Sequence, residues 1–248
     1  MNVRLKKRLG QHLLISSGVL NRIAEFAQLS EGEVVVEIGP GTGLLTKALL
    51  KYPLAKLYLI ELDPEMLEYL RENLKDERII LIQADATTFN YQELGERKLK
   101  VVGNLPYNVA SLIVENLIYY HPLIPLALFL VQKEVAEKWL SGKSWLSIFI
   151  QTFYELEYLM TVPPRFFKPQ PKVDSALIRF KQFIKKEITD LKKYKKFLTA
   201  LYQYKRKMLR KKIPEELLRE CNLANNLRAE DLKLTDIFLL YEKWLQYS

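Results

Sequence analysis

Three acidic residues close three separate apolar, β-branched stretches of the sequence. They are Glu37, Glu61 and Asp85, and stretches of this kind predict buried strands. In an open α/β sheet the carboxyl ends of the parallel strands meet at the edge where ligands bind, so these carboxylates are expected to crowd one crevice. Carboxylates accept hydrogen bonds from hydroxyl and amine groups and tolerate a cation, whereas they repel phosphates. The pattern favours an adenosine-containing, cationic ligand.

A glycine-rich turn follows the first of these stretches. An apolar run ends at Ile38, and a helix-forming stretch begins at Leu44. Between them, every second residue is a glycine: Gly39, Gly41 and Gly43. This order predicts strand, tight turn and helix, the first half of a βαβ unit, in which glycines let the backbone approach a ligand. The spacing G-x-G-x-G differs from the G-x-G-x-x-G of dinucleotide sites, and the sequence has no P-loop motif. Taken alone, the motif also fits a turn that binds nothing.

The segment Asn104-Leu105-Pro106-Tyr107 directly follows a fourth predicted strand, residues 99–103. Asn and Pro favour turns, so a purely structural bend is one interpretation. A fourth parallel strand ends at the same sheet edge as the three acids, however, which places an amide and an aromatic side chain at the expected crevice.

Composition and charge narrow the classes of protein. The chain has 248 residues, of which 49% are hydrophobic, enough for one large domain and a smaller one. With one cysteine and two histidines, neither an intramolecular disulfide nor a metal site is expected. No stretch approaches the roughly 20 apolar residues of a membrane span, and the basic N-terminus lacks a signal-peptide core, so a cytoplasmic protein is expected. The net charge of +9 favours polyanionic partners.

The positive charge is concentrated near the C-terminus. Residues 181–212 contain thirteen Lys or Arg against two acids, an excess of +11, while the rest of the chain is close to neutral. This shift predicts two domains, 1–181 and 182–248, the second one helical. Its lysines alternate with Tyr194, Tyr202 and Tyr204. The pattern favours an RNA-binding surface, and a solvated basic face over a tyrosine-lined core is the alternative.

Local patterns predict the remaining elements. Helices are expected over residues 19–26, with Ser16 or Ser17 as N-cap, and over 64–73 and 134–140. Further strands are expected over residues 127–132 and 148–159.

The motifs together resemble the ribosomal RNA adenine dimethyltransferases, more specifically the branch that acts on small-subunit RNA. The resemblance covers essentially the whole chain and rests on Gln11-His12-Leu13-Leu14, Glu37-Ile38-Gly39-Pro40-Gly41-Thr42-Gly43, Glu61-Leu62-Asp63, Ala84-Asp85-Ala86, Asn104-Leu105-Pro106-Tyr107 and Phe166-Phe167-Lys168-Pro169-Gln170-Pro171-Lys172-Val173-Asp174-Ser175. Two positions depart from the family pattern. His12 stands where the family more often has Asn, and Gln170 interrupts what is usually a triple proline.

The resemblance implies a fold, a cofactor and two sets of site residues. The fold is that of a class I S-adenosylmethionine-dependent methyltransferase, an α/β protein with a Rossmann-like seven-stranded sheet, followed by a small C-terminal α-helical domain. The last strand of this sheet, implied over residues 174–180, is antiparallel. The implied cofactor-binding residues are His12, Leu14, Gly39, Glu61, Asp85 and Asn104. Glu61 would bind the ribose hydroxyls and Asp85 the adenine amine. The implied catalytic residues are Asn104, Leu105, Pro106, Tyr107 and Phe167, with Tyr107 and Phe167 as aromatic walls for the target adenine.

The implied activity is dimethylation of the exocyclic amine of adenosines in small-subunit ribosomal RNA, two adjacent adenosines in a hairpin near the 3′ end. The implied partners are ribosomal RNA and the precursor of the small subunit, with a role in ribosome biogenesis, and a monomer is expected. A methyltransferase of large-subunit RNA that confers antibiotic resistance is one alternative. A ribosome-assembly or nucleic-acid-binding factor with secondary catalysis is another.

Overall fold

The computed structural model describes residues 12–204 and 206–247, and the chain folds into two compact units. The first unit contains the residues up to Ala136 together with Glu155–Gln182, and the second contains Glu137–Tyr154 and Phe183–Ser248. The motif residue Gln11, the basic N-terminal residues and Lys205 lie outside the described residues. The second unit thus combines an internal segment with the C-terminal one. Its role in binding RNA stays a prediction.

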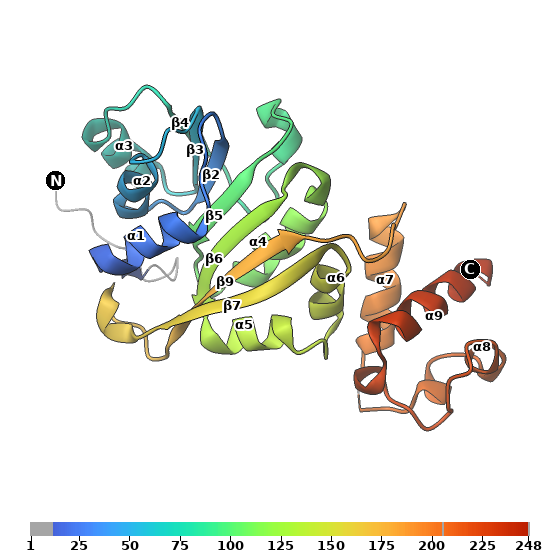
Figure 1. Cartoon of the computed structure of the whole chain (residues 1–248). Coiled ribbons are helices and arrows are strands. Elements are labelled where there is room, and N and C mark those ends of the chain that lie inside the picture. Colours follow the sequence, from blue (N-terminus) through green and yellow to red (C-terminus); the bar gives the residue numbers. More distant parts are fainter. Residues whose placement is uncertain (1–11, 205, 248) are drawn as a thin grey trace. The chain divides into compact units, whose positions relative to one another are not determined.

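The first unit is built on a seven-stranded sheet with the order β4-β3-β2-β5-β6-β9-β7 (Figure 1). The neighbouring pairs from β4 to β6 are parallel, and β9 is antiparallel to β6, which confirms the predicted class I methyltransferase fold. A two-stranded antiparallel sheet joins β1 to β8. The strands are β1 (Leu13–Leu14), β2 (Val34–Ile38), β3 (Lys56–Glu61), β4 (Ile79–Gln83), β5 (Lys100–Asn104), β6 (Leu126–Gln132), β7 (Tyr154–Val162), β8 (Phe167–Lys168) and β9 (Ser175–Gln182).

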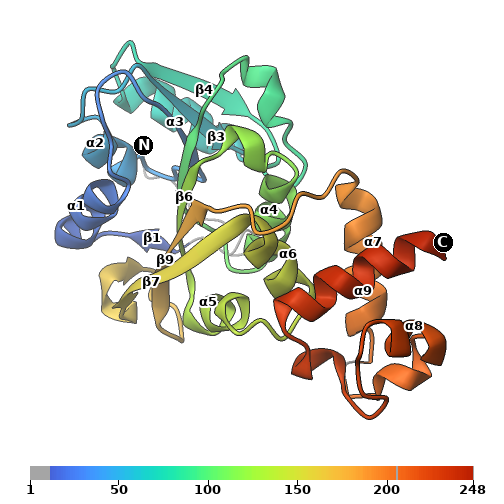
Figure 2. The ribbon, with the colours of Figure 1, turned by 45° about the vertical axis from the view of Figure 1, so that its right-hand side comes forward.

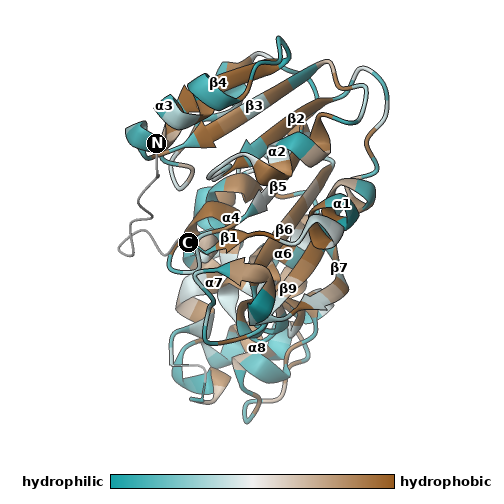
Figure 3. Cartoon of the chain, turned by 90° about the vertical axis from the view of Figure 1, so that its left-hand side faces the viewer, coloured by the Kyte–Doolittle hydropathy of each residue, from teal (hydrophilic) through white to brown (hydrophobic). Residues whose placement is uncertain are grey.

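Helices cover both faces of this sheet. Helices α1 and α2 lie on one side and α4 on the other (Figure 2). One core cluster joins Ile23 of α1, Leu49 of α2 and Leu70 of α3 to strand residues such as Leu59 and Val102. The strands are apolar along most of their length (Figure 3), as expected for parallel strands buried on both faces. The helices are α1 (Ser17–Phe26), α2 (Leu44–Leu49), α3 (Pro64–Asn73), α4 (Ala110–Ile118), α5 (Lys133–Leu140), α6 (Trp145–Phe153), α7 (Leu191–Tyr202), α8 (Glu215–Glu220) and α9 (Leu234–Gln246).

Capping residues determine where two of these helices begin. The Ser16 side chain accepts a hydrogen bond from the N–H of Val19, so Ser16 is the N-cap of α1. The Asp63 side chain accepts from the N–H of Glu65, and Pro64 occupies the first position of α3. Both helices were predicted, and the bounds of α3 agree with the predicted range.

The segment from Ile148 to Phe153 is a helix, so the strand predicted over residues 148–159 is wrong in its first half. The strand β7 begins only at Tyr154. Nearly every residue of α6 is buried, and a segment that is apolar on all sides has no period that separates a helix from a strand. The Ser144 side chain accepts a hydrogen bond from the N–H of Ser147 and starts the helix, despite the β-branched and aromatic composition of the segment.

The second unit has an aromatic core beneath its basic surface. Tyr194 of α7 packs against Tyr241 of α9 with 4.7 Å between ring centroids, and Tyr194 and Tyr202 are buried. Of the three tyrosines that alternate with lysines, only Tyr204 is exposed, at 65% of its surface. Two of the tyrosines therefore belong to the core, while lysines such as Lys192 and Lys196 stay in solvent. Among the described residues, no helix combines the length and apolar character needed to cross a membrane.

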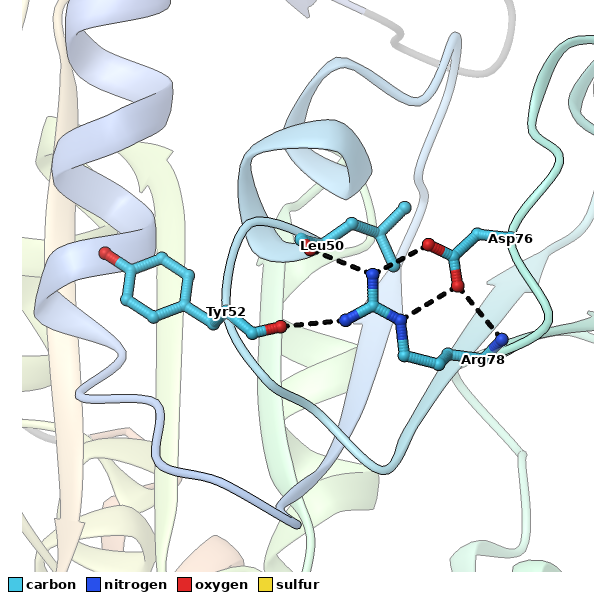
Figure 4. Close-up of polar contacts among 4 residues, drawn as sticks. All are labelled: Leu50, Tyr52, Asp76 and Arg78. Carbon is cyan, nitrogen blue, oxygen red and sulfur yellow. Dashed lines mark hydrogen bonds and ion pairs between the residues drawn. The ribbon is translucent and has the colours of Figure 1, made fainter.

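Arg78 ties the segment after α2 to the start of β4 (Figure 4). Its guanidinium donates to the backbone oxygens of Leu50 at 2.9 Å and Tyr52 at 2.8 Å, and it forms two further bonds to the Asp76 carboxylate at 2.7 and 2.9 Å. The bond to Leu50 satisfies a carbonyl at the end of α2. The bond to Tyr52 is a second one on that oxygen, which also accepts from the N–H of Leu54. Hydrogen bonds from Arg78 lower the pKa of Asp76 to about 2, so the contribution of its charge to stability is present above pH 3.8 and is lost as the pH falls through about 2.

Replacing Arg78 with methionine is expected to lower the free energy of unfolding by about 2 kcal/mol, because hydrogen bonds that involve a charged group contribute about 1.5–3 kcal/mol. Arg78→Lys should recover less than half of this loss, since an ammonium cannot present a planar fork. Urea unfolding of the three proteins measures the difference. Arg71→Met is the control, because Arg71 forms an exposed ion pair with Glu68 that is expected to contribute little. Equal losses in Arg78→Met and Arg71→Met would contradict this prediction.

Candidate active site

A cavity of about 310 Å³ opens at the carboxyl edge of the sheet. The ends of β2, β3 and β5, the segment before β1 and the start of α4 form its walls. Eight of the ten predicted site residues line it, and Leu14 and Phe167 do not. The lining residues are His12, Leu13, Gly39, Gly41, Glu61, Leu62, Asp85, Thr87, Asn104, Leu105, Pro106, Tyr107, Asn108, Val109 and Leu112.

The glycine turn forms the floor of the cavity between β2 and α2. Gly39, Gly41 and Gly43 have φ angles of +64°, +55° and +77°, which residues other than glycine rarely adopt. A Cβ atom at Gly41 would lie 2.7 Å from Leu13 Cδ2. The alternating glycines therefore fold a turn of left-handed residues and keep its surface bare for a ligand.

Glu61 presents a rigid carboxylate at the end of β3. The side chain is 5% exposed, and its Oε1 accepts hydrogen bonds from the N–H groups of Leu62 at 2.8 Å and Asp63 at 2.9 Å. Burial raises the pKa of Glu61, while the backbone N–H groups of Asp63, Leu62 and Gly41 act in the opposite direction. The backbone thus fixes one oxygen, and the carboxylate can accept further bonds from a diol at the cavity wall.

Asp85 presents a second acceptor after β4. Its Oδ1 accepts hydrogen bonds from the N–H of Thr87 at 2.8 Å and from Thr87 Oγ1 at 2.7 Å. Leu62 and Leu112 also line the cavity, although 51% and 52% of their surfaces are exposed. An acceptor beside two apolar side chains fits a flat ring that carries an amine. The sequence analysis gave no role in the site to Leu62, Leu112 or Thr87. Leucine and threonine occur throughout a protein, so no sequence pattern marks them as ligand-binding residues.

Glu37 does not line this cavity, so the expectation that three acids share one crevice is wrong for this residue. Its side chain points to the α2 side of the sheet, where Oε2 accepts a hydrogen bond from Thr46 Oγ1 at 2.7 Å. Burial raises the pKa of Glu37 to about 8, against the effect of the Thr46 hydrogen bond and with a smaller contribution from Glu61. The hydrogen bond between Thr46 and Glu37 joins α2 to β2.

Asn104 is the last residue of β5 and lies at the cavity wall. Its Nδ2 donates a hydrogen bond to the backbone oxygen of His12 at 2.8 Å. A backbone oxygen can only accept, so this contact fixes the orientation of the Asn104 amide and leaves Oδ1 as the acceptor. The N–H of the next residue, Leu105, donates to Leu130 of β6 at 3.0 Å, which anchors the turn to the sheet.

Tyr107 and His12 form a stacked pair at the cavity. Their ring centroids are 5.3 Å apart and the ring planes differ by 28°. His12 Nδ1 donates to the backbone oxygen of Pro169 at 2.8 Å, which fixes its tautomer. The Tyr107 hydroxyl shares a hydrogen bond of 2.5 Å with Ser175 Oγ. Ser175 was part of the motif that suggested the family, but its contact with Tyr107 could not be anticipated.

Phe167 and Leu14 belong to the hydrophobic core rather than to the cavity. Phe167 is 2% exposed and Leu14 is 3% exposed, and the two residues are paired in the sheet that joins β1 to β8. The ring that stacks on Tyr107 is that of His12, and the role of Phe167 as the second aromatic wall for the target adenine stays a prediction. Leu14 lies beneath the segment that carries His12 and also lines a smaller neighbouring cavity of about 30 Å³.

The residues present fit an adenosine-containing cation. Two glycines of the turn, a buried carboxylate, an exposed carboxylate and two exposed leucines line the same cavity. A phosphate would be repelled by the two acids, whereas a positively charged group would be attracted.

Comparisons with known proteins agree with this geometry. The model of the family described as ribosomal RNA adenine dimethylase matches residues 2–245. The "Ribosomal RNA small subunit methyltransferase A" of Persephonella marina is 42% identical over all of this chain and 96% of its own length, and that of Sulfurihydrogenibium sp. is 41% identical over 96% of each chain. The crystal structure of the 23S rRNA methyltransferase ErmE is 28% identical with a TM-score of 0.73, and covers 93% of this chain and 98% of its own. A dimethyladenosine transferase from Plasmodium falciparum shares the fold, with 23% identity, a TM-score of 0.82 and coverage of 95% and 98%.

Proposed function

This chain belongs to the ribosomal RNA adenine dimethylase family, and we propose that it dimethylates the exocyclic amine of adenosines in small-subunit ribosomal RNA with S-adenosylmethionine as methyl donor. The two relatives of 42% and 41% identity, both named for the small subunit, support this choice of RNA. The observation that carries the proposal is the position of the turn from Asn104 to Tyr107, which lies in the same cavity as Glu61 and Asp85.

We propose a role for each cofactor-binding residue, supported by the cavity that most of them line. When bound, S-adenosylmethionine supplies an electrophilic methyl group on a sulfonium centre. Glu61 would accept hydrogen bonds from the ribose hydroxyls, and Asp85 from the adenine amine. Gly39 would lie against the methionine part, where a side chain would be in the way. His12 closes this region through its contact with Asn104, and Leu14 supports it from the core.

Asn104 and Leu105 make the target amine reactive. The exocyclic nitrogen of adenine shares its lone pair with the ring and is a poor nucleophile until this overlap is weakened. Asn104 Oδ1 and the backbone oxygen of Leu105 would each accept one N–H bond and favour a tetrahedral nitrogen. Pro106 stiffens the turn that holds both acceptors. The methylated nitrogen is acidic enough to lose its proton to water, so orientation rather than a general base carries the catalysis.

Tyr107 would hold the target adenine outside its stack. A base must leave the helix to reach a cavity of this kind, and stacking on an aromatic ring contributes roughly 1–3 kcal/mol. Tyr107 is half-buried and its hydroxyl is anchored, so the ring offers a defined platform.

We further propose that the substrate is ribosomal RNA within a precursor of the small subunit, and that the target is two adjacent adenosines near the 3′ end. We also propose that the chain acts as a monomer in the cytoplasm.

The basic segment 181–212 is proposed to contact RNA phosphates outside the cavity. Exposed cations of this segment with no role in the core include Lys192, Lys196, Arg210 and Lys211. Replacing these four with Gln should reduce the slope of log affinity against log salt by about 3, because each lost phosphate contact removes roughly 0.7–0.9. Filter binding at several salt concentrations measures the slope.

The matched control replaces four exposed cations of the first unit that do not line the cavity, namely Arg22, Lys51, Lys75 and Lys98. This variant is expected to keep the wild-type slope. If the variant of segment 181–212 also keeps the wild-type slope, this segment is a solvated face and the RNA is bound elsewhere.

A methyltransferase of large-subunit RNA is the second candidate. The observation that favours it is the 28% identity to the 23S rRNA methyltransferase ErmE. Incubation of the chain with labelled methyl donor and with each ribosomal RNA separates the two. Label in small-subunit RNA is expected. Label confined to large-subunit RNA would support the second candidate instead.

A further inference from the structure

Ser175 is a buried polar residue that contacts the proposed base platform. Its side chain is fully buried, and Oγ lies 2.5 Å from the hydroxyl oxygen of Tyr107. Burial raises the pKa of Tyr107, and the hydrogen bond with Ser175 acts in the opposite direction. The roles proposed above rely on an anchored Tyr107 hydroxyl, but they give no role to Ser175, the residue that anchors it.

The direction of β9 explains why a residue so far along the chain reaches the cavity. The parallel strands end at the carboxyl edge, and because β9 is antiparallel to β6 it begins at that edge. Ser175 is the first residue of β9 and is paired with Gln132, the last residue of β6. Asn104, the last residue of β5, is paired with Leu130, which lies two residues before Gln132 in β6. Ser175 and the turn after β5 therefore meet at one edge of the sheet.

A second contact holds the same ring from the side. His12 stacks on Tyr107, and His12 is in turn held by the backbone oxygen of Pro169. Pro169 and Ser175 both belong to the segment that runs from the end of β8 to the start of β9. This segment thus fixes the ring at its hydroxyl and, through His12, at one face, and the ring lines the cavity.

We propose that Ser175 is a positioning residue for the target base, which acts by holding the Tyr107 ring at the angle at which an extruded adenine can stack on it. The inference rests on the proposed function, since it assumes that Tyr107 receives the base. A tyrosine side chain without this anchor can rotate about its first two torsions. The base would then be captured less often and in poorer alignment with Asn104.

A double-mutant cycle between Ser175→Ala and Tyr107→Phe tests this role. Either change removes the same hydrogen bond, and Tyr107→Phe does so without touching β9. Each is expected to lower kcat/KM for small-subunit RNA about tenfold, mainly through a higher KM for RNA, while the dissociation constant for S-adenosylmethionine stays within about twofold. The double variant is expected to be no worse than either single variant.

Tyr58→Phe is the matched control, because the hydroxyl of Tyr58 is also bonded to a side chain, at 2.9 Å to Glu96, but Tyr58 does not line the cavity. It should keep the wild-type kcat/KM. Effects of Ser175→Ala and Tyr107→Phe that multiply in the double variant, or a loss of cofactor affinity equal to the loss for RNA, would overturn the proposal. An inactive wild-type chain would instead contradict the proposed function, so the two failures can be told apart.

Discussion

Asn104→Ala is expected to lower the single-turnover rate of methyl transfer to ribosomal RNA by about 10²–10³-fold, the effect typical of removing one oriented group that acts on the transition state. The hydrogen bond from the target amine to Asn104 Oδ1 becomes strongest as the nitrogen turns tetrahedral, so its loss should appear in the chemical step rather than in binding. The affinity for RNA should change by less than about threefold.

A single-turnover assay with saturating cofactor, paired with a filter-binding curve on the same RNA, measures both quantities. Asn73→Ala is the control, because Asn73 is an exposed asparagine on α3 away from the cavity. Tyr107→Ala should differ from Asn104→Ala by weakening capture of the base as well as transfer. Near-normal transfer by Asn104→Ala would reduce the turn after β5 to a structural bend.

Glu61→Ala is expected to raise the dissociation constant for S-adenosylmethionine by about 100-fold, and Asp85→Ala by about tenfold. A hydrogen bond to a charged group contributes roughly 1.5–3 kcal/mol, or about one to two powers of ten in affinity. Glu61 is buried and oriented by backbone N–H groups, whereas Asp85 is exposed, so the first loss should be larger.

Calorimetric titration with S-adenosylmethionine measures these affinities. Glu72→Ala removes an exposed acid of α3 and serves as the control for the change in net charge. Thermal unfolding of each variant separates a lost contact from a lost fold. Unchanged affinity in both Glu61→Ala and Asp85→Ala would contradict the assignment of the cofactor site.

Most elements of the fold could be predicted from local features of the sequence. The glycine turn after Ile38 and the proline at the start of α3 each specify backbone conformation over a few residues, so their elements could be predicted with their bounds. The acids Glu61 and Asp85 lie where the edge rule for parallel sheets placed them. The family motifs added the antiparallel strand, which the residues alone do not indicate.

Features that depend on side-chain direction or on distant contacts could not be predicted. Glu37 has the same strand-end pattern as Glu61, yet its carboxyl turns toward Thr46 because α2 packs on that face. Phe167 is buried where β8 pairs with β1, and His12 stacks on Tyr107, and neither contact has a local pattern in the sequence. The helix α6 and its place in the second unit follow from packing rather than from any local period.

Mass spectrometry of small-subunit RNA after incubation with the chain and isotopically labelled S-adenosylmethionine tests the proposed reaction most directly. The substrate is supplied both as free RNA and within immature small subunits, and the nucleosides are analysed after digestion. Adenosine that carries two labelled methyl groups on its exocyclic nitrogen is expected, and the Asn104→Ala variant should form it about 10²–10³-fold more slowly. Tight binding of both substrates without labelled adenosine would contradict the catalytic role and identify the chain as a binding factor.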